Sequence, residues 1–599
     1  MGVLSDRELD REGFGRGRIA ALTSVLAPVF AGLLLLLAPS ASAGGIGGTE
    51  ILPDGTQRTT YTVGPLDITS GQNRIAYRPI TGTEKPAVDG WITRIKPDLV
   101  KADGSIPKSS RVMFHHGVWI NSSAPASERL FFATGEEKTI AKLPDGYGLR
   151  YRKSDNWILN HMVHNLVPDP MTLYVTYTID FIPDGSPLAE GIIPTKPIWM
   201  DVESGIYPVF DVLRDSGGAD GEFTYPEDAE NPYPPGRQKN EKTITEDGVL
   251  VATTGHVHTG GLSTNLYLKR DGASYAGPAC APRKDYSKRL GKLKKRKKQI
   301  VRKRKAAKRK YRASTQRKKV NRLTRKAKKN RKKLKKVRKL DSKARSAYRG
   351  CRSTQPRVEG NRVHLFDSKA EYFHDTGPVS WDMAMYSTDD DWRVEVKAGD
   401  TLELQTTYET EIASWYESMG INVVYMAPKA DAPDPYETRV DYEGVLNHGQ
   451  YPENNDHGGR NPIVGPDPRN LPDGLMSGGP FQIGGYTYEA GDFRLPGSLG
   501  RPPVVKKGES FTFDLSAGDS ANEIWHSVTS CKAPCNKSTG ISYPIPDGEF
   551  QFDSGQLGTG GPPTVNRDSW TTPANLPVGT HTFFCRIHPL MRGAIRVKR

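Results

Sequence analysis

Short stretches in which apolar and polar residues alternate recur along the chain between residues 50 and 280. In the run at 171–179, Met-Thr-Leu-Tyr-Val-Thr-Tyr-Thr-Ile, every second side chain is apolar or aromatic. Pro-Asp-Gly turns that begin at Pro53, Pro144 and Pro183 separate such runs. A two-residue period bounded by turn residues is typical of antiparallel strands. This part of the chain is therefore predicted to form antiparallel β-sandwich strands.

The hydrophobic period becomes helical between residues 283 and 350. Apolar residues follow at near seven-residue spacing on both sides of a break at 312–316, Arg-Ala-Ser-Thr-Gln. These positions are Leu293, Ile300, Ala307, Val320, Leu323, Ala327, Leu334 and Val337. The pattern predicts two helices that form a hairpin. Strand patterns resume at 362–366, so we expect the hairpin to be an insertion within a β domain.

The remaining chain divides into a linker and a further strand-rich segment. Residues 428–479 are rich in Gly, Pro, Asn and Asp, as expected of a linker, and residues 480–599 again show strands and turns. A chain of 599 residues is too long for one core, and 61 Gly with 45 Pro are too many for a mostly helical protein. We predict an all-β multidomain fold.

The positive charge of the chain is confined to the predicted hairpin. The whole chain has a formal net charge of +16, but residues 283–350 hold 36 Lys and Arg against two acids. The rest of the chain holds 48 basic and 66 acidic residues. Because like charges repel, we expect the helices to be marginally stable until a polyanion neutralises them. The alternative interpretation is a solvated spacer without a specific ligand.

The N-terminus has the features of an export signal. Arg16 and Arg18 precede an apolar stretch at 19–38, and Ala-Ser-Ala at 41–43 is a small-residue cleavage site. We expect residues 1–43 to be removed and the protein to be extracytoplasmic: secreted, periplasmic or on the cell surface. For the hairpin, cell-wall polymers, lipid headgroups or extracellular polysaccharide are then better candidate partners than nucleic acid.

Five cysteines in an exported protein allow two disulfides and leave one thiol. Cys531 and Cys535 are close in a Cys-Lys-Ala-Pro-Cys turn, and Cys280 and Cys351 bracket the hairpin, whose ends should meet. We predict the disulfides Cys280–Cys351 and Cys531–Cys535. Cys585 is left free.

The free cysteine belongs to a group of soft metal ligands. Cys585, His588 and Met591 follow one another at Cys-x-x-His-x-x-Met spacing in a loop between two predicted strands. An upstream strand, Ile-Trp-His-Ser-Val-Thr, supplies a second histidine, His526. Two imidazoles, a thiolate and a thioether form the ligand set of a blue-copper site with an axial methionine.

These residues resemble the cupredoxins, and the loop is most similar to those of the amicyanin and pseudoazurin kind. The resemblance covers residues 480–599 and implies a Greek-key β-sandwich with one type 1 copper held by His526, Cys585, His588 and Met591. It also implies single-electron transfer with an external donor or acceptor.

Several histidines upstream occur at spacings suited to metal binding. His115 and His116 are adjacent on a predicted strand, where only a bulge or a strand end would turn both to one side. His256 and His258 form a His-x-His pair, which places both rings on one face of a strand. Met419 lies at the start of an apolar strand.

The order of these elements resembles the copper type II, ascorbate-dependent monooxygenases, the family of peptidylglycine and dopamine hydroxylases. The resemblance covers roughly residues 60–270 and 360–427. It implies two tandem antiparallel β-sandwiches, which we place at 44–200 and 201–427, the second interrupted by the hairpin at 283–350.

The same resemblance implies two further coppers across a solvent-filled gap. An electron-accepting copper would be held by His115, His116 and either His161 or His164, of which we prefer His164. A second copper, which meets dioxygen and substrate, would be held by His256, His258 and Met419. The family's carboxylate-binding positions are here Thr254, Ile421 and Val423, so we do not expect a peptidyl-glycine substrate.

These features give two hypotheses for function. In the first, the cupredoxin copper takes an electron from an external reductant and passes it to a monooxygenase-like region, which uses dioxygen to hydroxylate a C–H bond. In the second, the chain is a non-catalytic electron-transfer or copper-handling protein whose cupredoxin is its redox metal site. No nucleotide-binding fingerprint is present, and we expect no nucleotide cofactor.

The other polar groups are not expected to carry chemistry. The adjacent acids Glu136 and Glu137 have the pattern of a solvated turn. The remaining histidines have no partners at ligand spacing, and we expect them to be structural: His364, His374, His448, His457 and His581.

Overall fold

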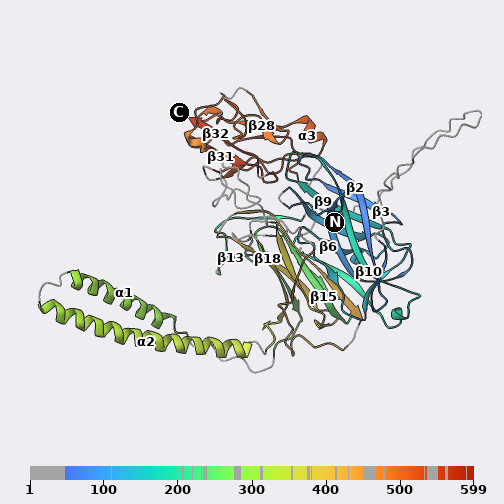
Figure 1. Cartoon of the computed structure of the whole chain (residues 1–599), viewed down its shortest axis with the longest axis horizontal. Helices are drawn as coiled ribbons and strands as arrows, with labels where there is room; N and C mark the ends of the chain where they lie inside the picture. Colours follow the sequence, from blue (N-terminus) through green and yellow to red (C-terminus); the bar gives the residue numbers. More distant parts are fainter. Residues whose placement is uncertain are drawn as a thin grey trace, which may run out of the picture. The chain divides into compact units, whose positions relative to one another are not determined.

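A computed structural model of the chain describes most of residues 48–599 (Figure 1). The positions without a description are 110, 204–207, 219, 231, 234–238, 276–284, 310–313, 353–354, 374–377, 379–380, 412–413, 429–430, 450–465, 476–478, 532, 534, 536–550, 560–563 and 589. The predicted signal segment 1–43 and the predicted Cys280–Cys351 disulfide lie outside the described residues. No helix in the described part is long and apolar enough to cross a membrane.

The N-terminal region, residues 48–201, is built from two sets of paired strands. Its strands are β1 (Glu50–Ile51), β2 (Gln57–Ile68), β3 (Ile75–Ile80), β4 (Gly90–Lys101), β5 (Val112–Asn121), β6 (Leu130–Thr134), β7 (Ala141–Lys142), β8 (Tyr147–Tyr151), β9 (Trp157–Asn165), β10 (Met171–Pro183) and β11 (Ile193–Asp201). Strand β10 pairs antiparallel with both β2 and β4, and a separate sheet has the order β3-β9-β5-β6. Side chains from both sheets share one core, which includes Val63, Trp119 and Val175.

The middle region, residues 208–449, contains a second strand network. Its strands are β12 (Phe210–Val212), β13 (Glu222–Tyr225), β14 (Glu241–Thr243), β15 (Gly248–Val257), β16 (Gly261–Lys269), β17 (Val358–Glu359), β18 (Arg362–Tyr372), β19 (Met383–Ser387), β20 (Val394–Val396), β21 (Thr401–Glu409), β22 (Trp415–Ser418), β23 (Gly420–Pro428) and β24 (Val445–Asn447). Strand β11 joins the two regions, because it pairs parallel with β8 and antiparallel with β23. The sheet edges of the two regions are thus hydrogen-bonded to each other.

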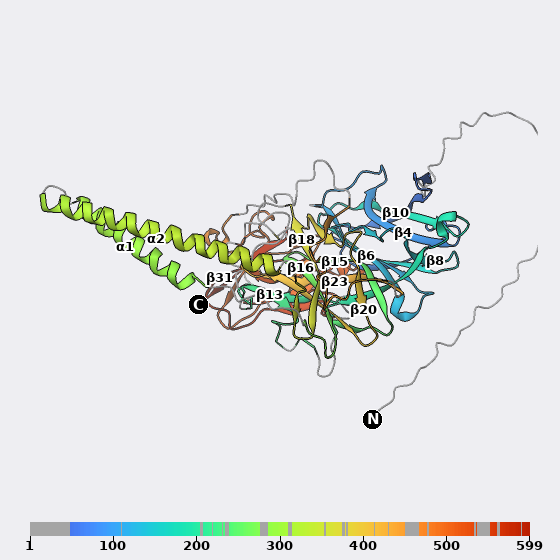
Figure 2. The ribbon, with the colours of Figure 1, turned by 90° about the horizontal axis from the view of Figure 1, so that it is seen from below.

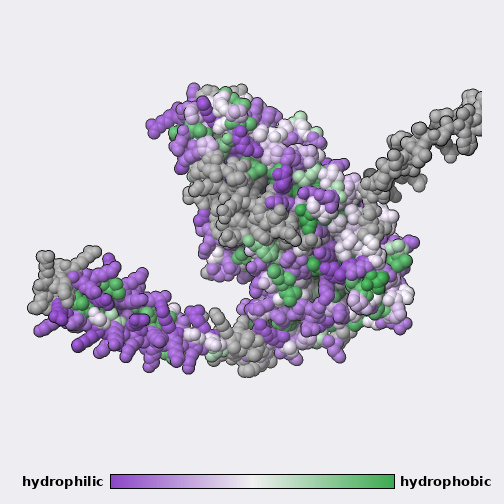
Figure 3. Space-filling view, in the orientation of Figure 1, coloured by the Kyte–Doolittle hydropathy of each residue, from purple (hydrophilic) through white to green (hydrophobic). Residues whose placement is uncertain are grey.

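The predicted helical hairpin is confirmed. Helix α1 spans Ser287–Arg309 and helix α2 spans Ser314–Arg352, and they lie side by side in two views (Figures 1 and 2). Ala307, Val320 and Leu323 form a small apolar cluster, and Asn330 donates a hydrogen bond to the carbonyl of Leu293 across 3.1 Å. The described hairpin surface is otherwise strongly hydrophilic (Figure 3).

Part of the predicted linker is packed against the middle region. Tyr436 and Val440 are buried in the core of that region, and β24 pairs with β19. The Tyr436 hydroxyl donates to the carbonyls of Leu268 and Asn361. Aromatic and β-branched residues therefore anchor positions 431–449 to the middle region. The prediction of a linker here rested on the Gly, Pro, Asn and Asp content alone.

The C-terminal region, residues 466–599, has two four-stranded sheets and a short helix α3 (Ala517–Ala521). Its strands are β25 (Phe481–Gly484), β26 (Thr487–Tyr488), β27 (Val504–Lys506), β28 (Thr512–Leu515), β29 (Thr529–Cys531), β30 (Ser569–Thr571), β31 (Gly579–Phe584) and β32 (Arg592–Lys598). The sheet orders are β26-β25-β28-β30 and β27-β32-β31-β29, and residues of both build one core. Cys531 and Cys535 form a disulfide, and Cys585 is a buried free thiol.

One-turn 3-10 helices lie at Ala126–Glu128, Pro187–Ala189 and Pro468–Asn470. The described residues are predominantly strand, as predicted.

Candidate metal centres

Three predicted ligands of the C-terminal region converge on one point. Cys585 follows the end of β31, His588 lies in the loop to β32, and His526 comes from the segment after α3. The Cys585 Sγ lies 3.9 Å from the His526 Nδ1 and 3.8 Å from the His588 Nδ1, and these two nitrogens are 3.1 Å apart. In the described part of the chain, this is the one group of three or more His, Cys, Asp and Glu residues whose donor atoms all lie within 4.8 Å of one another.

The backbone holds the fourth predicted ligand beside this group. Met591 is fully buried, its N–H donates to the carbonyl of His588 across 2.8 Å, and its own carbonyl accepts from Cys585 N–H. This loop closes between two antiparallel strands, β31 and β32. We call His526, Cys585, His588 and Met591 the C-terminal centre.

Neighbouring groups set the charge of the C-terminal centre. Burial opposes a charge on His526, but the Asp519 carboxylate 2.9 Å away and the Cys585 sulfur outweigh burial and raise the pKa of His526 to about 9. Burial would raise the pKa of Cys585, yet His526 and the N–H groups of Ser527 and His588 lower it overall. The thiolate is favoured, and the thiolate is the form of cysteine that binds metal.

The position of Asp519 follows from the local sequence. Ser516 caps the N-terminus of α3 and accepts a hydrogen bond from the Asp519 N–H. The Asp519 Oδ2 accepts from Gly485 N–H and contacts the His526 Nε2. The second nitrogen of His526 is thereby fixed, and its Nδ1 faces the thiol. Carboxylates that contact the second nitrogen of a metal-bound histidine orient its ring in this way.

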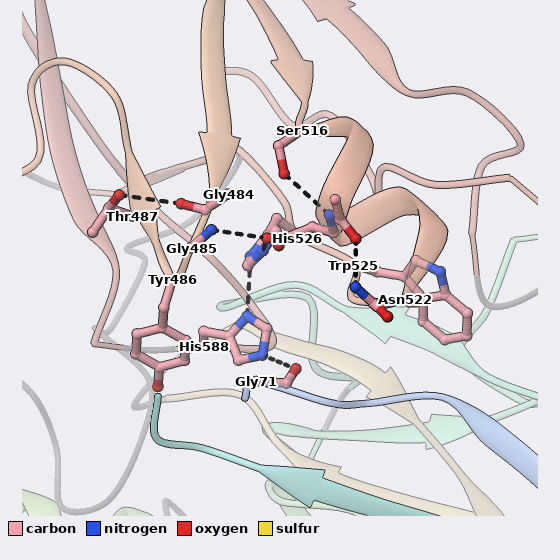
Figure 4. A network of polar contacts seen from close by, with 12 residues as sticks. Gly71, Gly484, Gly485, Tyr486, Thr487, Ser516, Asn522, Trp525, His526 and His588 are labelled. Carbon is pink, nitrogen blue, oxygen red and sulfur yellow. Dashed lines mark hydrogen bonds and ion pairs between the residues drawn. The ribbon is translucent and has the colours of Figure 1, made fainter. Parts of the chain in front are cut away.

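The second nitrogen of His588 contacts the N-terminal region. His588 Nε2 donates to the backbone carbonyl of Gly71 across 2.6 Å (Figure 4). The Tyr486 ring lies beside His588 at a centroid distance of 4.9 Å. Gly71 has a φ of +63°, and a Cβ there would lie 3.1 Å from the His588 Nε2. Glycine therefore allows the close approach.

Five of the upstream histidines form a second group, which we call the histidine cluster. A β-bulge between Phe114 and His116 leaves His115 as the extra residue of β5. A bulge was one of the two features expected to turn the adjacent rings of His115 and His116 to one side of the strand. The Nδ1 atoms of His115 and His116 are 3.4 Å apart. The members of the cluster are His115, His116, His164, His256 and His258.

His164 is the β9 histidine that joins this cluster. Its ring lies 4.4 Å from that of His115, and neither of its buried nitrogens has a hydrogen-bond partner. His161 is three residues away on an alternating strand and so faces the opposite side, towards the charges of Arg78 and Arg74. The geometry favours His164 over His161 as a ligand.

The His-x-His pair presents two fixed rings. His256 Nδ1 lies 2.9 Å from the Glu137 Oε1, and His258 Nδ1 donates to the carbonyl of Glu417. The Nε2 atoms of both rings are buried without a partner. A ring whose Nδ1 is held and whose Nε2 is left open is the arrangement of a metal-binding histidine.

Met419 lies next to His258 on a neighbouring strand end. The Tyr408 hydroxyl accepts from the N–H groups of both residues, at 2.8 Å and 3.2 Å, and donates to the Met419 carbonyl. The Met419 side chain packs with Ile421 and with Met162 of β9. The thioether thus faces the strand that carries His164. Tyr408 was not foreseen from the sequence.

The structure corrects the expectation of a gap between two ligand sets. The ring of His115, from the first predicted set, lies 4.5 Å from the ring of His258, from the second. Trp381 contacts both rings at centroid distances of 4.9 Å and is buried. The bulge turns His115 across the junction of the two regions, so their histidines share one cluster.

A second correction concerns Glu136 and Glu137, which are buried rather than solvated. Glu137 accepts from Gly135 N–H and contacts His256, and Glu136 accepts from Phe114 N–H. The Gly-Glu-Glu-Lys run has the composition of an exposed turn, so no pattern marked it. The partner of Glu137 lies 119 positions away in the chain.

Burial opposes a positive charge on four histidines of the cluster. Desolvation lowers the pKa of His115 and His258 well below 6.5, and that of His116 and His164 to about 3. Neighbouring rings add to the effect, because each would repel a second positive charge. The neutral imidazole is the form of histidine that binds metal ions.

No family model matches this chain, and no curated protein matches it either.

Proposed function

We propose that the chain is an exported copper redox protein whose C-terminal centre is a type 1 copper site. The convergence of Cys585, His526 and His588 on one buried point carries this proposal. Thiolate and imidazole donors with a nearby thioether suit copper, which such a site cycles between two oxidation states. The two sheets of the region, with their shared core, support a cupredoxin-like Greek-key β-sandwich.

The histidine cluster supports a second copper-binding role. His115, His116 and His164 form one ligand set of this proposal, and His256, His258 and Met419 form the other. When bound, copper at these positions would supply dioxygen chemistry, in which a reductant of the ascorbate class provides two electrons, one oxygen atom becomes the hydroxyl group on carbon, and the other leaves with two protons as water. The open Nε2 atoms of His256 and His258 and the unpartnered ring of His164 fit such a role.

A pocket lined in part by β15, the strand that carries His256, offers room for an organic substrate. It has a volume of about 430 Å³ and is lined in part by Thr254, Ser387 and Asn447. Thr254 lies two residues before His256 and thus on the same face of β15. The lining combines hydroxyl and amide groups with charged side chains of both signs, Arg94 and Lys142 alongside Asp389 and Asp390.

A specific observation favours the alternative, a non-catalytic electron-transfer or copper-handling protein. His115 contacts His258, and Trp381 packs against both, so the described structure places side chains where the hydroxylases keep solvent. In this alternative the C-terminal centre is the redox metal site, and the upstream histidines bind copper only for storage or structure.

The basic hairpin fits an anchoring role outside the cell. We propose that α1 and α2 bind a polyanionic surface, such as a cell-wall polymer, lipid headgroups or an extracellular polysaccharide. The support is the excess of Lys and Arg on two helices whose mutual contact is a thin apolar stripe. Association of this kind depends on charge and weakens with salt.

Copper content of the mature protein tests both proposals. After reconstitution and desalting we expect about three coppers per chain and an intense visible copper–thiolate absorption. Cys585→Ser should remove that absorption and leave the upstream copper bound. About one copper per chain would overturn the monooxygenase proposal, and a colourless protein would overturn the type 1 site.

Copper-dependent consumption of dioxygen separates the enzyme from the alternative. With ascorbate as reductant, an enzyme should couple oxygen uptake to hydroxylation of an added organic substrate. Protein that holds all its copper, yet forms no hydroxylated product from a broad substrate panel, would favour the non-catalytic alternative.

A further inference from the structure

The loop between β2 and β3, residues 69–73, touches both proposed copper centres. On one side, the Gly71 carbonyl accepts a hydrogen bond of 2.6 Å from the His588 Nε2 (Figure 4). On the other side, the Gln72 carbonyl accepts one of 2.8 Å from the Asn165 N–H. That amide nitrogen is bonded directly to the carbonyl carbon of His164.

A short chain of bonds therefore connects a ligand of one centre to a ligand of the other. It consists of the His588–Gly71 hydrogen bond, the Gly71–Gln72 peptide, the Gln72–Asn165 hydrogen bond and the backbone of His164. The Gln72–Asn165 bond has an ordinary N–H···O length, and the His588–Gly71 bond of 2.6 Å is slightly shorter than the usual range of about 2.7–3.2 Å.

The N-terminal region holds the 69–73 loop in place. Asn165 is fully buried, and its side-chain amide donates to the carbonyls of Thr69 and Asp169 at 2.8 Å each. The Gly71 N–H donates to the Val167 carbonyl. The loop is thus pinned to the end of β9, just beyond His164, and Asn165 acts as a positioning residue.

The C-terminal region is held against the same loop. Asn73 is buried, and its Oδ1 accepts from the backbone N–H of Trp525, the neighbour of His526. A side chain at position 71 would push on His588 and also on Tyr486, whose ring would lie 3.2 Å away. Both His526 and His588 are therefore placed by contacts to residues 71–73.

We propose that the 69–73 loop is an internal electron path from the C-terminal centre to the histidine cluster. This inference rests on the proposed function, since it requires a metal at each end. In each transfer the C-terminal centre loses one electron and the histidine cluster gains it. No bond is made or broken, and His588 keeps its Nε2 proton. A one-electron reductant of the ascorbate class restores the C-terminal centre.

Rapid partial reduction of the copper-loaded mature protein without oxygen tests this path. A pulse of one-electron reductant bleaches the visible absorption of the C-terminal centre, and its recovery reports the electron leaving. In the native protein we expect first-order recovery with a rate that does not change with protein concentration. Gly71→Ala should slow recovery by about tenfold to a hundredfold, as in other reactions that depend on sub-ångström positioning.

Two further variants test the path even if Gly71→Ala fails to fold. Asn73→Ala removes the clamp to Trp525 without a new side chain in the contact, and it should also slow recovery. Arg74→Ala breaks an exposed ion pair with Glu523 in the same interface but off the path, and it should leave the rate unchanged. Copper content should match that of the native protein in all three variants, and recovery is followed at each variant's own absorption maximum.

The outcomes distinguish the path from the proposed function. A recovery that depends on protein concentration, or one that is equally fast in Gly71→Ala and Asn73→Ala, would overturn the path while the copper sites remain. Equal slowing by Arg74→Ala would also overturn it, because docking as a whole would then set the rate. A protein without the visible absorption would overturn the proposed function, and the path with it.

Discussion

Glu137 holds His256 by a contact of 2.9 Å between a carboxylate oxygen and the Nδ1 of the ring. The two residues come from different regions of the chain, so the contact joins the N-terminal region to the His-x-His strand. The His256 Nε2 is left without a hydrogen-bond partner and is the ring nitrogen available to a metal. The contact is the arrangement in which a carboxylate strengthens a metal-binding imidazole.

Replacing Glu137 with Gln should therefore weaken copper binding at the histidine cluster by about tenfold to a hundredfold. The amide keeps the shape of the side chain but loses its charge. Competition with a chelator, followed by copper analysis, measures the change. Glu128→Gln, at a half-buried acid in the 3-10 helix Ala126–Glu128, is the control, and the visible absorption of the C-terminal centre should be unaltered in both variants. Unchanged copper affinity in Glu137→Gln would show that the carboxylate serves only packing.

Replacing Asp519 with Asn should raise the reduction potential of the C-terminal centre. The carboxylate contacts the His526 Nε2, and a nearby negative charge stabilises the more positive oxidation state of a metal. We expect a rise of about 60 mV, which equals a tenfold change in a one-electron equilibrium. A redox titration of the visible absorption measures it. Glu523→Gln, an exposed acid close in sequence, should leave the potential nearly unchanged, and a fall in Asp519→Asn would contradict the argument.

Replacing Met419 with Ile should sharply lower ascorbate-driven oxygen uptake. The change removes the thioether proposed as a ligand but keeps an apolar side chain of similar volume. Met162→Leu is a matched control, since Met162 packs against Met419 in the same cluster. The visible absorption should persist in both variants. Full oxygen uptake by Met419→Ile would exclude the thioether as a ligand that the reaction needs.

The structural histidine His364 should make the protein less stable in acid. Its ring stacks between Tyr267 and Tyr442, and burial, with a contribution from Arg357, lowers its pKa to about 3. Below pH 6.5 the unfolded chain gains a proton at this site that the folded chain does not. The free energy of unfolding should therefore fall as the pH drops from 6.5 towards 3, by less than about 1.4 kcal/mol per pH unit.

His364→Gln tests this pH dependence by denaturant unfolding at several pH values. The variant should show a smaller loss of stability between pH 6.5 and 4 than the native protein. The comparison at pH 7.5 gives the packing cost of the substitution alone. Parallel pH profiles for the two proteins would rule out His364 as a source of acid sensitivity.

The basic hairpin should bind anionic vesicles at low ionic strength and release them as salt is added. Each Lys or Arg near such a surface contributes about 1 kcal/mol, and screening by salt removes this attraction. Sedimentation of vesicles that contain anionic lipid measures binding, and neutral vesicles serve as the control. A protein that lacks residues 285–352 should not bind. Retention at high salt would contradict an electrostatic anchor.

Local patterns in the sequence were sufficient to predict the strand-rich fold, the helical hairpin and the loop from Cys585 to Met591 in the C-terminal centre. Cys585, His588 and Met591 lie within seven positions, so one loop brings them together whatever the rest of the chain does. The helices follow from a hydrophobic period that needs no distant partner. Features of this kind are set by neighbours in the chain.

Contacts between distant segments could not be predicted in the same way. Glu137 meets His256 only because two strand networks join at β11 and β23, and Gly71 meets His588 across most of the length of the chain. The burial of Glu136 and Glu137 and the contact of His115 with His258 depend on how two regions pack. No periodicity in either segment encodes that packing.

The site of the hairpin insertion allows its length to vary without cost to the sheet. Strands β16 and β18 are antiparallel neighbours, with Lys269 opposite Arg362, so the chain leaves and re-enters the sheet at adjacent points. A tight turn would connect these strands as well as two helices do. The hairpin is therefore a replaceable module. It can be shortened, lengthened or exchanged for another surface-binding segment while the strands around it keep their register.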